Sequence, residues 1–178
     1  GQNGENKSGF SFGTSKLEII DLGCGDGTLT VEMAKFATSV IGVDFNPDML
    51  ASARQRIDRL GLQNVKLLAE DAGNLSLPAE SLDVVFFSQS LHHLDNPQRG
   101  FQEAARILRP GGKVLVMELA THSEEWVLEK LGHKWLGFEK ETLHDFMHTA
   151  GFSNLYSQIL PFRREELFQI ILAAGSKT

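Results

Sequence analysis

The 178-residue chain lacks features that several classes of protein require. Its single cysteine, Cys24, excludes an internal disulfide and a metal site of several thiolates, and it suits a reducing compartment. No apolar run approaches the roughly 20 residues of a membrane-spanning helix, and the first residues do not form a signal-peptide pattern. The formal net charge of −6 provides no basic excess for sequence-independent nucleic-acid binding. We therefore expect a cytoplasmic domain whose main partner is neither a nucleic acid nor a membrane.

Hydrophobic residues make up 42% of the chain and charged residues 22%, which is ordinary for a globular domain. Residues 1–16 differ from the rest, since they are rich in glycine, serine and asparagine. We expect a flexible tail or linker there, because such a composition buries too little apolar surface to order itself. Residues 17–178 are expected to form one domain, since their length suits a single hydrophobic core.

From Leu17 onward, short apolar runs alternate with segments of helical spacing, a pattern typical of a parallel sheet with crossover helices. The runs predict buried strands at 17–22, 40–43, 65–69, 82–87 and 113–119, and two last strands, 152–160 and 167–174, joined by a loop of hairpin length. The spacing predicts helices at 28–37, 48–60, 97–108 and 141–150, and a further helix capped by Ser123. Pro110-Gly111-Gly112 is expected to end the third of these helices. The predicted class is α/β with seven strands.

The strongest local signal is a glycine-rich turn between the first strand and the first helix, Asp21-Leu22-Gly23-Cys24-Gly25-Asp26-Gly27. Glycines permit positive φ and close approach of a ligand, so the turn predicts a nucleotide-like ligand. The plain alternative is a tight connection without a ligand. The spacing G-x-G-x-G differs from the G-x-G-x-x-G that binds a dinucleotide pyrophosphate, which disfavours a nicotinamide-dependent oxidoreductase.

Acidic residues end the next two predicted strands. Asp44 ends the second strand, about twenty residues after the turn, where a carboxylate can accept both hydroxyls of a ribose. Asp71 follows the third strand. Because open α/β sheets bind ligands at the carboxyl edge of their strands, Asp21, Asp44 and Asp71 predict one crevice.

Together these segments resemble the class I S-adenosylmethionine-dependent methyltransferases, from Leu17 to about Ala174. The glycine turn is similar to the first motif of that family, and Glu70-Asp71-Ala72 is similar to its adenine-edge motif. The segments 87–94 and 106–113 also agree in order with family segments after the fourth strand and before the fifth.

The resemblance implies a Rossmann-like, doubly wound sheet that is mostly parallel, with one antiparallel strand near the C-terminus. It implies methyl transfer from S-adenosylmethionine to a small-molecule acceptor, with S-adenosylhomocysteine as product. Asp44 would hold the ribose, Phe45 would flank the adenine, and Asp71 would accept from the adenine amine. The implied cofactor site consists of Asp21, Gly23, Cys24, Gly25, Gly27, Asp44, Phe45, Met49, Asp71, Ala72 and Ser88.

Histidines supply the candidate catalytic residues. His92 and His93 follow the fourth strand, where an imidazole can deprotonate or orient a substrate, and His93 is preferred; packing at the strand end is the alternative. Asp95 either orients one of them or begins the next helix. No metal site is predicted, because the helical pair His144 and His148 lacks a third ligand and suits a solvated helix flank.

Residues 121–138 follow the fifth strand, where the resembled family places inserts that face the substrate. The large side chains there either line a substrate pocket or cover the sheet edge as core: Trp126, Trp135, Leu136 and Phe138. The segment also resembles methyltransferase domains fused to ArsR-type winged-helix regulators. This resemblance implies a fused or bound regulatory partner, and a non-catalytic sensor of the cofactor as the alternative function. The last two strands leave a homodimer open.

Overall fold

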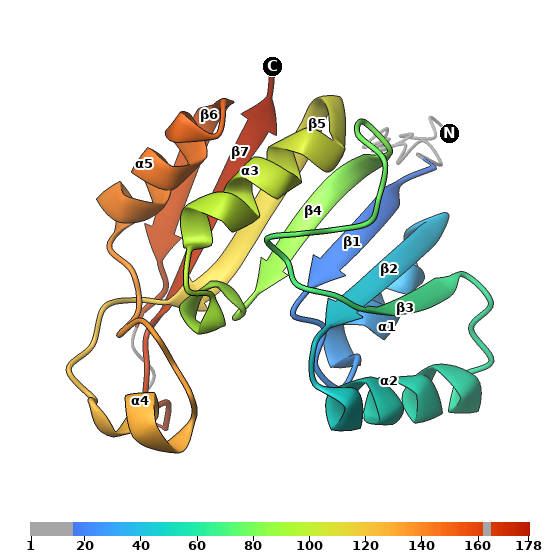
Figure 1. Ribbon diagram of the computed structural model, residues 1–178, viewed down its shortest axis with the longest axis horizontal. Helices are drawn as coiled ribbons and strands as arrows, with labels where there is room; N and C mark the ends of the chain where they lie inside the picture. The colour runs from blue at the N-terminus through green and yellow to red at the C-terminus, as the bar shows by residue number, and fades with distance from the viewer. Residues whose placement is uncertain (1–15, 162–164) are drawn as a thin grey trace, which may run out of the picture.

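The computed structural model describes residues 16–161 and 165–178, which form one seven-stranded sheet flanked by helices (Figure 1). The strand order is β3-β2-β1-β4-β5-β7-β6. The tail expected over residues 1–16 falls, except for Lys16, outside the described residues. In the part of the chain that is described, no helix is both long and apolar enough to cross a membrane.

The sheet confirms the predicted fold class. β1 to β5 run parallel, and β7 is antiparallel to both of its neighbours, β5 and β6 (Figure 1). The strands are β1 (Glu18–Leu22), β2 (Ser39–Asp44), β3 (Val65–Ala69), β4 (Leu82–Ser88), β5 (Leu108–Leu119), β6 (Phe152–Ile159) and β7 (Ile170–Lys177). The helices are α1 (Thr28–Ala34), α2 (Pro47–Arg59), the 3₁₀ turn η1 (Leu91–His93), α3 (Pro97–Ile107), α4 (Trp126–Lys130) and α5 (Lys140–Thr149).

The central strands are buried on both faces, as their apolar runs predict. Successive residues of a strand point to opposite faces, so Ile20 joins the larger core cluster while Ile19 joins a smaller one with Ala34 of α1. The larger cluster takes Phe101 from α3 and Leu143 from α5, two helices that lie over the same face of the sheet (Figure 1). Helices therefore cover both faces, as in other doubly wound sheets.

Two local predictions are wrong. Helix α3 ends at Ile107 and β5 begins at Leu108, so Pro110-Gly111-Gly112 lies inside a strand and ends no helix. The pairing of β4 with β5 shifts register at this point, since Leu82 pairs with Leu108 whereas Val84 pairs with Lys113, so Pro110-Gly111-Gly112 falls within the irregularity. Ser123 caps no helix, since α4 begins at Trp126 after Glu125 and receives no side-chain cap. The loop predicted before the last strand includes residues 162–164, which lie outside the described residues.

The sheet places the predicted crevice at a reversal of strand order. From β1 the chain proceeds outward through β2 to β3, and then crosses to the other side of β1 to form β4 and β5. The carboxyl ends of β1 and β4 are therefore followed by loops that diverge, which is where such sheets bind ligands. The arrowheads of β1 and β4 point downward in Figure 1, and η1 follows β4 after two residues.

Candidate functional site

The glycine turn after β1 is fixed against its neighbours. The N–H groups of Gly23 and Cys24 donate to the carbonyl of Val43 at 2.8 and 2.9 Å, which ties the turn to the end of β2. Gly23 has φ +82°, and a Cβ at this position would lie 2.3 Å from the Cβ of Ser90. Only glycine allows the turn to pack this closely against the segment after β4.

The carboxylate of Asp44 is oriented by backbone donors. The N–H groups of Gly25 and Asn46 each donate to one of its oxygens at 2.9 Å. A carboxylate has about four acceptor positions, so two remain for a ligand. The Asn46 side chain in turn caps α2 by accepting from the N–H of Asp48 at 2.9 Å. The strand end, the turn and the helix start thus hold one carboxylate in place.

A cavity of about 740 Å³ opens beside this carboxylate. Two stretches of sequence line it, which we call the first wall (residues 23–72, after β1, β2 and β3) and the second wall (residues 89–134, from η1 and the segment around α4). The cavity falls within the size range of small-molecule sites. The predicted site residues that line it are Gly23, Gly25, Asp44, Phe45, Met49, Asp71, Ala72 and His93.

Two apolar side chains of the first wall are unusually exposed. The Phe45 side chain is 71% exposed and that of Met49 is 38% exposed, although both belong to the hydrophobic class that normally packs inside. Asp71 lies near them, with one carboxylate oxygen accepting from the N–H of Gly73 at 2.7 Å. This end of the cavity therefore offers a flat apolar ring beside a hydrogen-bond acceptor, which suits a planar heterocycle.

Other predicted site residues lie outside the cavity lining. Asp21 is fully buried in β1, where the Thr30 hydroxyl donates to one carboxylate oxygen at 2.7 Å and the other oxygen has no partner among the described residues. Burial raises the pKa of Asp21 to about 6. Burial, followed by the charge of Asp21, also raises the pKa of the Cys24 thiol to about 12. Cys24 therefore fills the turn as an unreactive small side chain.

Two further predicted site residues, Gly27 and Ser88, also lie outside the cavity lining. A Cβ on Gly27 would lie 3.0 Å from that of Ala53, so this glycine lets α1 start close to α2. Ser88 ends β4 without lining the cavity, whereas the next residue, Gln89, lines it. Gln89 has φ +48°, a left-handed conformation that non-glycine residues seldom adopt and that is often found at functional sites.

The two candidate catalytic histidines differ in position. His93 lines the cavity, and burial, followed by the neighbouring His92, lowers its pKa, so its imidazole is neutral at neutral pH. His92 is buried outside the lining, with its Nδ1 hydrogen-bonded to Glu118. Among the two, only His93 is placed to contact a ligand in the cavity.

The segment around α4 contributes residues to the cavity that were not predicted as site residues from the sequence. Leu131, Gly132 and Lys134 belong to the second wall, and the Lys134 ammonium pairs with Asp95, which therefore orients neither histidine.

The large side chains that were proposed for this role lie elsewhere. Phe138 belongs to the core, Trp135 packs against it, and Trp126 is 38% exposed away from the lining.

Comparison with known proteins identifies the family. The family described as "Methyltransferase domain" matches residues 20–116, more than half of the chain. Demethylmenaquinone methyltransferase of Tropheryma whipplei (strain Twist) is 35% identical over 107 residues, which are 60% of this chain and 44% of that protein. The chloroplastic 2-methyl-6-phytyl-1,4-hydroquinone methyltransferase 2 of Oryza sativa subsp. japonica is 31% identical over 79% of this chain and 40% of its own length.

A solved structure shares the fold. Haemonchus contortus phosphoethanolamine N-methyltransferase 2 in complex with S-adenosyl-L-methionine superposes with a TM-score of 0.79 at 19% identity, over 90% of this chain and 48% of that chain. The chain belongs to the methyltransferase domain family. It spans less than half the length of the two curated relatives described above.

Proposed function

We propose that this chain binds S-adenosylmethionine in the cavity and transfers its methyl group to a small-molecule acceptor. The observation that carries the proposal is the pair of carboxylates, Asp44 at the end of β2 and Asp71 just after the end of the adjacent β3, which line one cavity of about 740 Å³. Family membership and the spacing of the glycine turn favour this cofactor over a dinucleotide.

The first wall fits the nucleoside part of the cofactor. Two acceptor positions remain on Asp44, matching the two hydroxyls of a ribose. Asp71 has one oxygen engaged by Gly73 and a second that can accept from an adenine amine. The exposed ring of Phe45 offers the adenine an apolar face, and the N–H of Ala72 is assigned to a ring nitrogen.

The glycine turn fits the amino-acid part. Gly25 lines the cavity, and the position of a Cβ on it has no heavy atom within 4 Å. A side chain would therefore project into open space at the turn, whereas glycine leaves that space and the backbone to a ligand.

The cofactor supplies a methyl group already activated on a positively charged sulfur. What remains for the protein is to align the acceptor with that methyl group, an effect worth at most ~7–11 kcal/mol, and to take up a proton. The neutral imidazole of His93 can accept that proton or orient the acceptor. The acceptor would lie along the second wall, between Ser90, His93 and Leu131.

Substitution of Asp44 tests the placement of the cofactor. Asp44→Ala removes two hydrogen bonds to the ribose, each worth ~1–3 kcal/mol, and should weaken S-adenosylmethionine binding at least tenfold in calorimetry. Asp48→Ala is the matched control, because this exposed carboxylate lies four residues away and does not line the cavity. Equal affinity of the Asp44 variant and the control would contradict the placement.

Turnover distinguishes the enzyme from the sensor. The full chain is incubated with methyl-labelled S-adenosylmethionine and a cell extract, and labelled product and S-adenosylhomocysteine are measured by mass spectrometry. We expect both with the natural chain and much less of each with the Asp44 variant. Cofactor binding without any labelled product would favour a sensor domain that reports cofactor level to a fused or bound regulator.

A further inference from the structure

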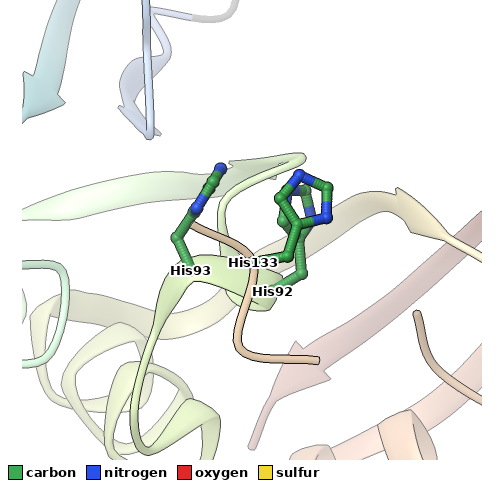
Figure 2. Close-up of side chains that lie close together, drawn as sticks. All are labelled: His92, His93 and His133. Atoms are coloured by element: carbon green, nitrogen blue, oxygen red, sulfur yellow. The ribbon is translucent and has the colours of Figure 1, made fainter. Parts of the chain in front are cut away.

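Three histidines from two separate segments meet beside the cavity. His92 and His93 belong to η1, and His133 lies after α4. One ring nitrogen from each lies within 4.8 Å of the other two, and within the described ranges no other three histidine, cysteine or acidic side chains meet in this way. Figure 2 shows the three rings projecting to the same side of the η1 turn.

The backbone holds the two segments together independently of the rings. The N–H of Lys134 donates to the carbonyl of His92 at 2.7 Å, and the N–H of His133 donates to that of Val127 at 3.2 Å. The His92 ring lies 4.1 Å from the His133 ring and 4.3 Å from the His93 ring, measured between centroids. The bond from Lys134 to His92 therefore brings the two segments together, and the side-chain conformations bring the ring nitrogens together.

His92 has the kind of hydrogen-bond partner that metal-binding histidines usually have, a carboxylate. Its Nδ1 is hydrogen-bonded to Glu118, a fully buried carboxylate that also accepts from the N–H groups of Leu91 and Leu119 at 3.0 and 2.9 Å. A neutral His92 that donates from Nδ1 has its lone pair on Nε2. Metal-bound histidines usually donate their other ring N–H to such a carboxylate, which fixes the tautomer that binds.

His133 has a polar atom that the described residues leave unsatisfied. Its Nδ1 is buried and has no hydrogen-bond partner among them. A buried polar atom without a partner destabilises a structure by about 1–3 kcal/mol, so such atoms are uncommon. With respect to the described residues, this nitrogen is therefore free to bind an ion.

We propose that His92, His93 and His133 bind a divalent transition-metal ion of the zinc type, with one coordination position open toward the cavity. Three imidazoles and an open position are the ligand set of catalytic zinc sites, and imidazole favours zinc, copper, nickel or iron over magnesium and calcium. Nitrogens at 2.0–2.1 Å from a tetrahedral ion lie about 3.3 Å apart, so the ligating nitrogens would approach one another by at most roughly 1.5 Å on binding, through rotation of the rings. We place the open position toward the cavity because His93, one of the three ligands, lines it.

A bound ion would change the role of His93. An imidazole that binds a metal accepts no proton, so an oxygen or sulfur of the acceptor would instead be polarised by the ion. This consequence rests on the proposed methyl transfer, whereas metal binding itself does not.

Metal titration tests the site directly. The tag-free full chain is stripped with a chelator and titrated calorimetrically with zinc chloride in the absence of S-adenosylmethionine. We expect one ion per chain, no comparable binding of magnesium, and visible absorption bands of tetrahedral geometry when Co²⁺ replaces zinc. Absence of zinc binding and of the Co²⁺ bands would overturn the proposal, whatever the outcome for the cofactor.

Single variants assign the ligands. His133→Ala should weaken zinc binding at least tenfold and abolish the Co²⁺ bands. The fold should tolerate this change, because the ring nitrogen Nδ1 has no partner to lose among the described residues. His148→Ala, an exposed histidine of α5, is the control and should bind zinc as the natural chain does. Unchanged zinc binding in the first variant, or loss in the control, would place the ion elsewhere and overturn the proposal.

Discussion

The two walls of the cavity are built in different ways. The first wall consists of the turns that follow three neighbouring parallel strands, where backbone N–H groups orient carboxylates, as Gly25 and Asn46 do for Asp44. The second wall joins the η1 turn to the loop after α4 through loop contacts, such as the hydrogen bond from the Lys134 N–H to the His92 carbonyl. The first wall should therefore bind the ligand that the family shares, and the second should determine the acceptor.

Gly23→Ala should have the largest effect, because this residue joins the two walls. A positive φ disfavours alanine by about 1–2 kcal/mol, and relieving the 2.3 Å overlap with Ser90 adds roughly 1–3 kcal/mol. We expect the free energy of unfolding in urea to fall by about 4 kcal/mol. Gly61→Ala, with φ +64° and no atom within 4 Å of a new Cβ, should lose only the smaller, conformational part. Equal losses in the two variants would show that the walls do not depend on this contact.

Asp21→Asn, in the strand that leads into the first wall, should stabilise the protein at neutral pH. The native pKa of about 6 lies above the ordinary 3.8, so folding favours the protonated form, and this advantage is lost as the pH rises from about 4 through 6. The ionised side chain then lowers stability by about 3 kcal/mol at most. Asparagine carries no charge and still accepts from Thr30.

Urea unfolding between about pH 4 and pH 8 measures this difference. The variant should exceed the natural chain in stability at pH 8 and approach it at pH 4. The exposed residue Asp58 provides the control, since Asp58→Asn should show no such trend. A constant difference at every pH would contradict the raised pKa of Asp21.

Lys134→Ala should have the smallest effect on folding. It tests whether the second wall affects the acceptor without affecting cofactor binding. The Lys134–Asp95 pair is exposed, so its loss should change stability by less than about 1 kcal/mol. We expect S-adenosylmethionine to bind with unchanged affinity and KM for the acceptor to rise, with Lys130→Ala as an exposed control. A loss of cofactor affinity would show that the second wall contributes to cofactor binding.

The difference between the two walls also explains which parts of the fold and of the site could be predicted from the sequence. Every strand and the long helices follow from local apolar patterns, and Asp44 and Asp71 were found because strand ends of a parallel sheet share one edge. The start of β5 was missed, because Pro110-Gly111-Gly112 has the composition of a turn although tertiary pairing draws it into the strand.

The arrangement of the second wall could not be predicted, because no local sequence pattern shows which of its segments come into contact. Nothing in the spacing of His133 relates it to His92, and the contact exists only because the loop after α4 folds back onto η1. Glu118 likewise reads as part of an apolar strand, and only the structure shows it buried against His92. The left-handed conformation of Gln89 is also unpredictable, since glycine or asparagine would be expected there.

The most direct test of the central claim is which ligand the cavity prefers. Calorimetric titration of the natural chain with S-adenosylmethionine, S-adenosylhomocysteine and NAD compares the three under one set of conditions. We predict saturable binding of the first two with one site per chain, and no measurable binding of NAD. Tight binding of NAD without binding of the other two would contradict the assignment of the first wall to S-adenosylmethionine.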